Sequence, residues 1–434
     1  MKDFIALILA GGLGVRMRSD ITKVLHPICG RPMIDFVLDA VISNKPEKTF
    51  VIAGEHNKKQ LVDYFKFTKR NSVDVILQKK PLGTADAVKS TKARLKGLRG
   101  QVLIVCADTP LIRANTLRII FEHHLQTEAD CTILTTFLDN ATGMGRVVRD
   151  EFSKIKEIIE ESDATEFQKR IKEVNSGVYC FKINELLTTI DRIEKNEKKK
   201  EYYLTDIVHI FYEQKKKIES FICDDTTECL GVNSQSDLTK ANSIMRQRII
   251  EHFLNEGVFI VDPQSTFIDW DVKIGKNTKI LPFSIIESGV KIGENCSIGP
   301  FCHLRPGTTI DDESCIGNFT ELVRSFIGSQ SRCKHFSYLG DTYVGKKVNI
   351  GAGVVVANYD GKNKNPTTIR DGAFIGCDSV LIAPVKIGKK VVTGAGSVIT
   401  KNSSIKDGEV VVGVPARSLK ELKKEKQVNS KKSK

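Results

Sequence analysis

The chain has 434 residues, of which 41% are hydrophobic, 27% charged and 7% aromatic. At roughly 150 residues per domain, this length predicts two to three domains, each with enough apolar residues for its own core. The composition is typical of a globular protein and excludes a disordered chain. The formal net charge of +13 raises nucleic-acid binding as a hypothesis.

A net charge of +5 out of the +13 lies at the C-terminus, where residues 420–434 contain seven Lys and two Glu. Other lysine clusters, at 198–200 and 215–217, lack interleaved aromatic residues or the pattern of a recognition helix. A solvated surface and a frayed tail therefore explain the charge better than a nucleic-acid partner does.

Membrane insertion and secretion are not expected. The longest apolar run near the start, residues 4–10, is well short of the roughly 18 residues that cross a bilayer. The eleven cysteines include no C-x-x-C pair, which argues against a zinc site or a redox motif. We expect a cytoplasmic protein whose reduced thiols mostly fill core positions.

Residues 1–235 alternate buried-strand patterns with amphipathic helical patterns. Strand patterns cover 4–9, 49–53 and 102–106, and a helical pattern covers 115–126. This alternation predicts an α/β domain with a mainly parallel, Rossmann-like sheet and helices on both faces. Ligands of such sheets bind at the carboxyl ends of the strands.

Residues 236–256 place apolar side chains at helical spacing before Gly257, and Ser236 or Asp237 can cap a helix there. We interpret this segment as a linker helix between two domains. It separates the α/β pattern from a different repeat in the remainder of the chain.

A period of six governs residues 257–434. Aliphatic residues recur at every sixth position from Ile274 to Leu322, and Gly directly follows several of them. This hexapeptide repeat predicts a parallel β-helix whose aliphatic side chains point inward and whose glycines form tight corners. The polar segment 356–366 interrupts the repeat, and such a loop is a natural place for function.

A glycine-rich loop, L-A-G-G-L-G-V-R-M at 9–17, follows the first strand pattern directly. Glycines let backbone N–H groups approach a phosphate, and Arg16 and Lys23 add positive charge that suits a nucleoside triphosphate. The loop is not a P-loop, and Met17 stands where the dinucleotide fingerprint has its third Gly. Asp108 follows the third strand pattern, where a carboxylate at the carboxyl end of a strand is either a ligand-site residue or a helix cap.

The G-G-x-G-x-R-M pattern with its downstream Lys resembles the sugar-phosphate nucleotidyltransferases. With the hexapeptide half added, residues 4–418 are similar to the bifunctional N-acetylglucosamine-1-phosphate uridylyltransferase / glucosamine-1-phosphate N-acetyltransferase family. The resemblance implies a left-handed β-helix and a homotrimer with the acetyl site shared between chains, without nucleic-acid or membrane partners. The small molecules that it implies are UTP, N-acetylglucosamine-1-phosphate, glucosamine-1-phosphate, acetyl-CoA and the cofactor Mg²⁺.

The resemblance also implies a uridylyltransferase site. Arg16 would be catalytic at the phosphates, and Asp108 and Asn233 would hold the Mg²⁺. The nucleotide would be bound by Leu9, Ala10, Gly11, Gly12, Lys23 and Asn233, and its uracil base would contact Gln78, Gly83 and Thr84. The sugar would be bound by Gly145, Glu160 and Asn175. The family pattern usually has Lys and Thr where this chain has Leu13 and Val15.

A second site is predicted in the β-helix. Acetylation of an amino sugar requires a base for the ammonium proton, and His suits neutral pH. His335 lies in the polar cluster C-K-H-F-S-Y-L-G-D, where a histidine on a β-helix is by itself more often a surface residue. The motifs R-P-G at 305–307, G-N-F-T-E at 317–321 and A-N-Y-D-G at 357–361 also resemble the family's acetyltransferase site.

By this resemblance His335 would be the proton acceptor. The sugar phosphate would be bound by Arg305, Arg324, Tyr338, Asn349 and Lys364. Acetyl-CoA would be bound by Ala352, Asn358, Tyr359, Cys377, Ala395 and Arg417. The family pattern has Lys, Ser and Arg where this chain has Val323, Cys377 and Gly413.

Two alternatives remain open. Because Val323 and Gly413 depart from the family pattern, the chain could be a sugar-1-phosphate nucleotidyltransferase alone, with the β-helix as a trimerisation or regulatory module. The other alternative is a non-enzymatic nucleic-acid-binding scaffold. Release of free thiol from acetyl-CoA in the presence of glucosamine-1-phosphate distinguishes the bifunctional enzyme from the first alternative.

Overall fold

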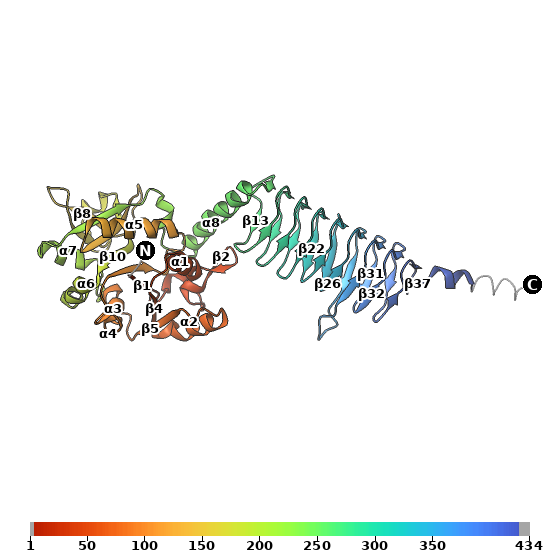
Figure 1. Ribbon diagram of the computed structural model, residues 1–434, viewed down its shortest axis with the longest axis horizontal. Helices are drawn as coiled ribbons and strands as arrows, with labels where there is room; N and C mark the ends of the chain where they lie inside the picture. Colours follow the sequence, from red (N-terminus) through yellow and green to blue (C-terminus); the bar gives the residue numbers. More distant parts are fainter. Residues whose placement is uncertain (1–3, 425–434) are drawn as a thin grey trace, which may run out of the picture. The chain divides into compact units, whose positions relative to one another are not determined.

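The computed structural model describes residues 4–424. They form two compact units that meet at Ile244 and Met245, inside helix α8 (Gln235–Asn255). In the first unit, helices surround a twisted sheet, and the second unit consists of short strands stacked coil upon coil (Figure 1). Among the described residues, no helix is long and apolar enough to cross a membrane. Residues 425–434, most of the basic tail, lie outside this description.

The main path of the first sheet has the strand order β11-β7-β10-β6-β1-β4-β5. Its strands are β1 (Phe4–Leu9), β4 (Lys48–Gly54), β5 (Val73–Gln78), β6 (Gln101–Cys106), β7 (Cys131–Phe137), β10 (Glu173–Lys182) and β11 (Ile218–Ile222). All neighbours pair in parallel except β10, which is antiparallel to both β6 and β7. The ribbon β8 (Arg146–Arg149) and β9 (Ile155–Ile159) joins at β10. The predicted mainly parallel sheet is confirmed.

Helices cover this sheet. They are α1 (Met33–Ile42), α2 (Glu55–Phe67), α3 (Thr84–Lys89), α4 (Lys92–Leu95), α5 (Ala114–Thr127), α6 (Ile183–Thr189) and α7 (Asp206–Glu213). The apolar runs that predicted strands form the centre of the sheet, where Leu7, Ile52 and Ile104 are fully buried. Strands β1 and β6 end side by side, with Leu9 paired to Cys106. The glycine loop and Asp108 therefore leave the sheet at the same edge.

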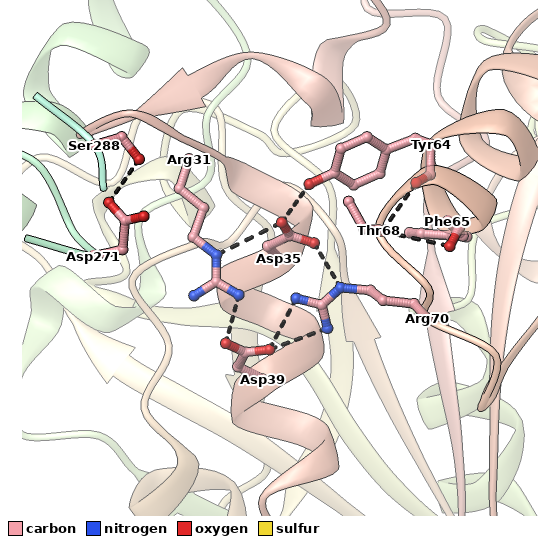
Figure 2. Close-up of polar contacts among 9 residues, drawn as sticks. All are labelled: Arg31, Asp35, Asp39, Tyr64, Phe65, Thr68, Arg70, Asp271 and Ser288. Atoms are coloured by element: carbon pink, nitrogen blue, oxygen red, sulfur yellow. Dashed lines mark hydrogen bonds and ion pairs between the residues drawn. The ribbon is translucent and has the colours of Figure 1, made fainter. Parts of the chain in front are cut away.

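An ion-pair network holds α1 against the end of α2 (Figure 2). The Asp35 carboxylate accepts a hydrogen bond from the Tyr64 hydroxyl at 2.5 Å and lies 3.1 Å from Arg70 Nε. Asp39, one turn further along α1, pairs with both Arg31 and Arg70. Because Asp35 is almost fully buried, these partners offset the cost of removing its charge from water.

The cap of α8 differs from the prediction. Ser234 Oγ accepts from the Asp237 N–H at 3.2 Å, and the Asp237 carboxylate accepts from the Ser234 N–H at 2.9 Å. This reciprocal pair is a capping box. The cap is therefore Ser234, and neither Ser236 nor Asp237 fills the cap position as expected.

The second unit is a left-handed parallel β-helix with three faces. The first face contains β12 (Phe259–Ile260), β15 (Lys279–Ile280), β18 (Ser297–Ile298), β21 (Cys315–Ile316), β24 (Arg332–Cys333), β27 (Asn349–Ile350), β30 (Phe374–Ile375), β33 (Val392–Thr393), β36 (Val410–Val412) and the antiparallel β37 (Arg417–Ser418). The second face contains β13 (Phe267–Ile268), β16 (Ile285–Ile286), β19 (His303–Leu304), β22 (Thr320–Val323), β25 (Ser337–Gly340), β28 (Val355–Ala357), β31 (Val380–Ile382) and β34 (Val398–Ile399). The third face contains β14 (Lys273–Ile274), β17 (Lys291–Ile292), β20 (Thr309–Ile310), β23 (Phe326–Ile327), β26 (Thr342–Val344), β29 (Thr367–Ile369), β32 (Val385–Ile387) and β35 (Ser404–Ile405).

Three corners connect these faces, and the chain visits them in a fixed order. We call the turn from the first to the second face the first corner, the turn from the second to the third face the second corner, and the turn back to the first face the third corner. Successive coils place equivalent residues above one another, so side chains 17 or 18 positions apart become neighbours. This arrangement determines which parts of the repeat can form a site.

The aliphatic residues of the repeat point inward as predicted, and Ile298, Leu304 and Ile310 are at most 1% exposed. The glycines have two roles. Some form left-handed corners as expected, among them Gly299 with a φ of 95° and Gly307 with a φ of 80°. At Gly317 a Cβ would lie 1.8 Å from the Lys334 carbonyl oxygen of the next coil, so glycine is needed there for the close approach of two coils. Other left-handed corner positions are occupied by residues such as Asn295, with a φ of 55°.

The interruption of the repeat is shorter than predicted. Strand β28 continues through Ala357 with Val356 fully buried, and the next strand begins at Thr367. The excursion therefore begins at Asn358 rather than at residue 356.

Candidate functional sites

The glycine loop lies against a buried glutamine. A Cβ on Gly11 would come within 2.5 Å of Gln78 Oε1, so only glycine fits there. Gln78 is buried, and its Nε2 donates to the Gly83 carbonyl at 3.0 Å and to Asp86 Oδ2 at 2.9 Å. Gly83 has a φ of 104°, and Thr84 Oγ1 accepts from the Leu204 N–H. The residues expected to contact the base are thus brought together around one side chain.

Lys23 reaches two residues that are far from it in the sequence. Its Nζ lies 2.5 Å from Asp108 Oδ2 and 3.1 Å from Asn233 Oδ1. The Asp237 carboxylate holds the Asn233 backbone through its N–H at 3.1 Å. Asp108 does not cap α5, because that helix begins at Ala114 with Arg113 at the cap position. Three of the predicted phosphate and metal residues therefore converge at one point.

The residues expected to hold the sugar also form a group. A Cβ on Gly145 would lie 3.7 Å from Glu160 Oε2 and 3.8 Å from Asn175 Cβ. Asn175 Nδ2 donates to the Tyr179 hydroxyl at 2.7 Å, and the Thr205 hydroxyl donates to Glu160 Oε1 at 2.9 Å. Burial raises the pKa of the Glu160 carboxyl above its usual value, since the charged form loses hydration.

Two adjoining cavities of about 800 and 750 Å³ connect these groups. Leu9, Arg16, Asp108 and Asn233 line both cavities. Arg16 is exposed and lies two residues after Gly14, where a φ of 64° turns the loop. Tyr179 and Thr205 line the first cavity, although sequence reasoning did not select them. Each comes from an element that carries no motif of its own, so the sequence offered no signal for either residue.

Leu13 and Val15, which replace the family's Lys and Thr, line the second cavity and are 57% and 77% exposed. They contribute no charge to it. Ala10 and Gly12 line the same cavity, together with Lys23. The positive charge beside the glycine loop therefore comes from Arg16 and Lys23.

In the β-helix, His335 occupies the first corner, immediately before β25. Its side chain is exposed, and its carbonyl oxygen accepts from the Ser337 hydroxyl at 2.8 Å. Tyr338 lies two strand positions away from this corner on the second face, with its hydroxyl 3.5 Å from Asn358 Oδ1. The predicted base thus lies at the edge of a face that carries polar side chains.

Asp341 connects the other polar residues of this face. Its carboxylate accepts from Arg324 Nε at 2.6 Å, from Arg324 Nη2 at 2.9 Å and from Asn358 Nδ2 at 2.6 Å. The Arg324 hydrogen bond is the main cause that lowers the pKa of the Asp341 carboxyl. Glu321 holds Arg305 in the same way, with Nη1 at 2.8 Å. Both carboxylates end motifs that the sequence analysis quotes, but neither received a role there, although the separation of about one coil from each arginine was a usable signal.

The position of residue 323 in a strand explains why this chain has Val there in place of the family's Lys. Val323 is buried in β22, so its side chain does not reach the site. The next residue, Arg324, turns outward at the second corner with a φ of 47°. In the excursion that follows β28, the backbones of Tyr359 and Lys364 form an isolated antiparallel β-bridge. The cationic residues predicted at the sugar phosphate therefore lie at the second corner and in the excursion.

The remaining predicted residues lie elsewhere on the β-helix. Ala352, Cys377 and Ala395 occupy the first corner of successive coils beyond His335. Asn349 on β27 and Arg417 on β37 belong to the first face, whereas Tyr338 belongs to the second. One chain therefore divides the predicted acetyltransferase residues between two faces that meet at the first corner.

These features define the class of protein. A glycine loop with two cations at the carboxyl edge of an α/β sheet is the construction of a nucleotidyltransferase. The coiled second unit is that of a hexapeptide-repeat transferase. Residues 5–248 match the family described as Nucleotidyl transferase, and residues 271–302, 289–324 and 366–401 match Bacterial transferase hexapeptide (six repeats).

Curated relatives span nearly the whole chain. It is 37% identical over 437 residues to Bifunctional protein GlmU of Listeria monocytogenes serotype 4a (strain HCC23), covering 93% of this chain and 94% of the relative. The proteins of the same name from Geobacillus sp. (strain WCH70) and Shouchella clausii (strain KSM-K16) are 39% and 37% identical. They cover 91% and 92% of this chain, and 92% and 94% of the relatives. The chain belongs to the bifunctional GlmU family, which confirms the resemblance found in its motifs.

Proposed function

We propose that the chain makes UDP-N-acetylglucosamine in two reactions. It first transfers the acetyl group of acetyl-CoA to glucosamine-1-phosphate and then transfers the uridylyl group of UTP to N-acetylglucosamine-1-phosphate, releasing pyrophosphate. We place the uridylyltransferase domain at 1–235, the linker helix at 236–256 and the acetyltransferase domain at 257–434. The eleven free thiols support a cytoplasmic location, because reducing compartments keep cysteines unpaired.

The convergence of Lys23, Asp108 and Asn233 beside the glycine loop is the observation that supports uridylyl transfer. The oxygen of the sugar phosphate attacks the α-phosphorus of UTP, and the bond from that phosphorus to the oxygen of the β-phosphate breaks. Arg16 and Lys23 stabilise the negative charge that develops on the phosphates. Gln78 and the Gly83 backbone orient the base, and the group around Glu160 and Asn175 positions the sugar.

A divalent cation fits the pair Asp108 and Asn233. Their oxygens already converge on one cation, the Lys23 ammonium. Carboxylate and amide oxygens are ligands that Mg²⁺ accepts, together with water and nucleotide phosphates. Within residues 4–424 no group of three or more His, Cys, Asp or Glu side chains could hold a metal, so most ligands would come from outside the chain. Bound Mg²⁺ would neutralise phosphate charge in this site.

Acetyl transfer rests on His335 at the first corner and the polar face beside it. His335 accepts the proton of the substrate ammonium, and the amine nitrogen then attacks the thioester carbonyl carbon. A nitrogen–carbon bond forms, the carbon–sulfur bond breaks, and coenzyme A leaves as the free thiol. Arg305, Arg324 and Lys364 bind the phosphate of the sugar. Arg324 takes the part of the lysine that this chain lacks at 323.

We further propose a homotrimer whose chains share the acetyltransferase site. The division of the predicted residues between two faces supports this arrangement, since Asn349 and Tyr338 lie on different faces of one chain. The first face of one chain and the second face of a neighbour would together supply the complete set.

The test uses two assays on one preparation of the full chain. Acetyl-CoA and glucosamine-1-phosphate should release free thiol, and UTP with N-acetylglucosamine-1-phosphate should release pyrophosphate. Pyrophosphate release without thiol release would refute acetyl transfer and leave the chain a nucleotidyltransferase alone.

A further inference from the structure

Two acceptors fix the orientation of the Gln78 amide. Its Nε2 donates to the Gly83 carbonyl oxygen at 3.0 Å and to Asp86 Oδ2 at 2.9 Å. A carbonyl and an ionised carboxylate only accept hydrogen bonds, so the nitrogen of the amide has to face them. The other end of the amide, the oxygen Oε1, therefore points away from both.

Gln78 Oε1 faces the glycine loop. It lies 2.5 Å from the point where a Cβ on Gly11 would stand, and Gln78, Gly11 and Gly12 line the second cavity together. Within residues 4–424, no donor forms a hydrogen bond to this oxygen. Gln78 thus offers one unused acceptor beside the loop that is expected to hold the nucleotide.

Helix α3 holds both acceptors in place. The Gly83 carbonyl oxygen also accepts from the Ala87 N–H at 3.1 Å, and Asp86 lies in the first turn of the helix, where the helix dipole favours a carboxylate. The Ala85 N–H donates to the Tyr202 carbonyl oxygen at 2.9 Å, which ties the start of α3 to a distant segment. The two acceptors therefore keep their positions relative to Gln78.

A fixed acceptor distinguishes the two common pyrimidine bases at their ring atom N3. Uracil carries an N–H there, which donates a hydrogen bond, whereas cytosine carries a bare nitrogen, which accepts one. Gln78 Oε1 can therefore pair with uracil but would oppose an acceptor in cytosine. Cytosine would fit only if the amide rotated by half a turn, and Oε1 would then face the Gly83 carbonyl and the Asp86 carboxylate.

We propose that Asp86 is a positioning residue that keeps Gln78 Oε1 turned toward the base and thereby selects UTP over CTP. This role rests on the uridylyl transfer of the proposed function. Rotation of the amide would break two hydrogen bonds, one of them to a charged group, and would bring acceptor oxygens together. Gln78 is only 3% exposed, so water does not offset that cost.

The test compares pyrophosphate release from UTP and from CTP, with N-acetylglucosamine-1-phosphate as the second substrate. In Asp86→Asn the new amide can turn either its oxygen or its nitrogen to Gln78, so the glutamine can adopt both orientations. We expect the ratio of kcat/KM for UTP to kcat/KM for CTP to fall by about tenfold to a hundredfold. Most of this change should be a rise in activity with CTP, which a loss of structure would not produce.

Two further variants and one further nucleotide complete the design. Asp86→Ala leaves the Gln78 amide without a partner at this position and should also lower the ratio. Asp74→Asn changes an exposed carboxylate on β5, the strand that carries Gln78, and is the matched control that should keep the wild-type ratio. The ratio of UTP to dTTP should be the same in Asp86→Asn as in the wild type, because uracil and thymine present the same N–H.

Two outcomes would overturn the role of Asp86 while leaving uridylyl transfer intact. One is an Asp86→Asn variant that keeps the wild-type ratio of UTP to CTP, and the other is a variant that loses activity with both nucleotides in equal measure. A wild-type chain that releases no pyrophosphate from UTP would refute the uridylyl transfer itself, and with it the role of Asp86.

Discussion

At the scale of single residues, Lys23 links the parts of the proposed uridylyltransferase site. Its ammonium contacts Asp108 and Asn233, which lie 85 and 210 positions away in the sequence. The same group lies beside the glycine loop, where a triphosphate would bind. A lysine in this position both balances the Asp108 carboxylate in the free protein and supplies charge to the transition state.

Lys23→Met should therefore lower kcat/KM for pyrophosphate release by about a hundredfold to a thousandfold, the usual effect of removing one preorganised charge contact. Thiol release should not change, because the proposed acetyltransferase site lies in the other unit. Lys66→Met, at an exposed position of α2, is the matched control and should leave both rates as they are. An equal loss of both activities in the Lys23 variant would contradict independent sites.

In the β-helix, we propose that Asp341 is a positioning residue. It orients the Arg324 guanidinium through two hydrogen bonds and holds Asn358 through a third. Asp341→Asn should raise KM for glucosamine-1-phosphate about tenfold, because the arginine loses a charged partner. We expect a smaller change in kcat, since the hydrogen bonds of Asp341 go to Arg324 and Asn358, neither of which is the proposed base. A loss of kcat with unchanged KM, measured by thiol release, would show that Asp341 has another role.

At the scale of elements, one buried histidine joins a helix to the sheet. His124 of α5 is 1% exposed and hydrogen-bonds to Thr132 of β7 at 2.8 Å and to Gln101 of β6 at 3.0 Å. Burial is the largest cause that lowers its pKa to about 4, from an ordinary value of 6.5. The folded protein therefore favours the neutral ring, and the stability that this ring contributes is present above pH 6.5 and is lost as the pH falls towards 4.

From this shift, the free energy of unfolding of the first unit should fall by about 2 kcal/mol between pH 7 and pH 5. His124→Gln should be less stable than the wild type at pH 7 but should lose that part of the pH dependence. Urea titrations followed by circular dichroism at 222 nm measure both. His252→Gln, at an exposed site, should keep the wild-type slope. An identical slope in the His124 variant would rule out this histidine as its source.

The elements also show what the sequence could predict. Strand β1 matches the predicted range 4–9 because a central parallel strand is apolar along its whole length. The period of six identified the β-helix because every coil buries the same positions. The antiparallel β10 was not predicted, since its direction depends on partners distant in the sequence. The cap of α8 was misplaced by two or three residues, because several neighbouring polar residues were equally suitable.

For the sites, position at a strand end was enough to select Asp108. Glu160, Asn175 and Asn233 carried no local signal and entered through the resemblance alone. Asp341 was missed because its role depends on Arg324 in the preceding coil. Local sequence thus predicts which edge of the fold binds ligands, whereas the partners of each side chain are determined by the tertiary structure.

At the scale of the whole molecule, we propose that the two compact units carry one reaction each. The amine of the first substrate becomes the amide of the second, so the product of the β-helix is the substrate of the α/β domain. The uridylyl transfer needs only N-acetylglucosamine-1-phosphate and UTP, and it does not need acetyl transfer to take place in the same molecule. Supplying N-acetylglucosamine-1-phosphate should therefore bypass any defect in the β-helix.

The measurement that tests this central claim most directly compares wild type and His335→Ala in both assays. The wild type should release free thiol from acetyl-CoA with glucosamine-1-phosphate, and pyrophosphate from UTP with N-acetylglucosamine-1-phosphate. The variant should lose about a hundredfold or more of the thiol release, the contribution of a general base, and keep the pyrophosphate release. A wild-type protein that releases pyrophosphate but no thiol, or a variant that retains full thiol release, would contradict the account.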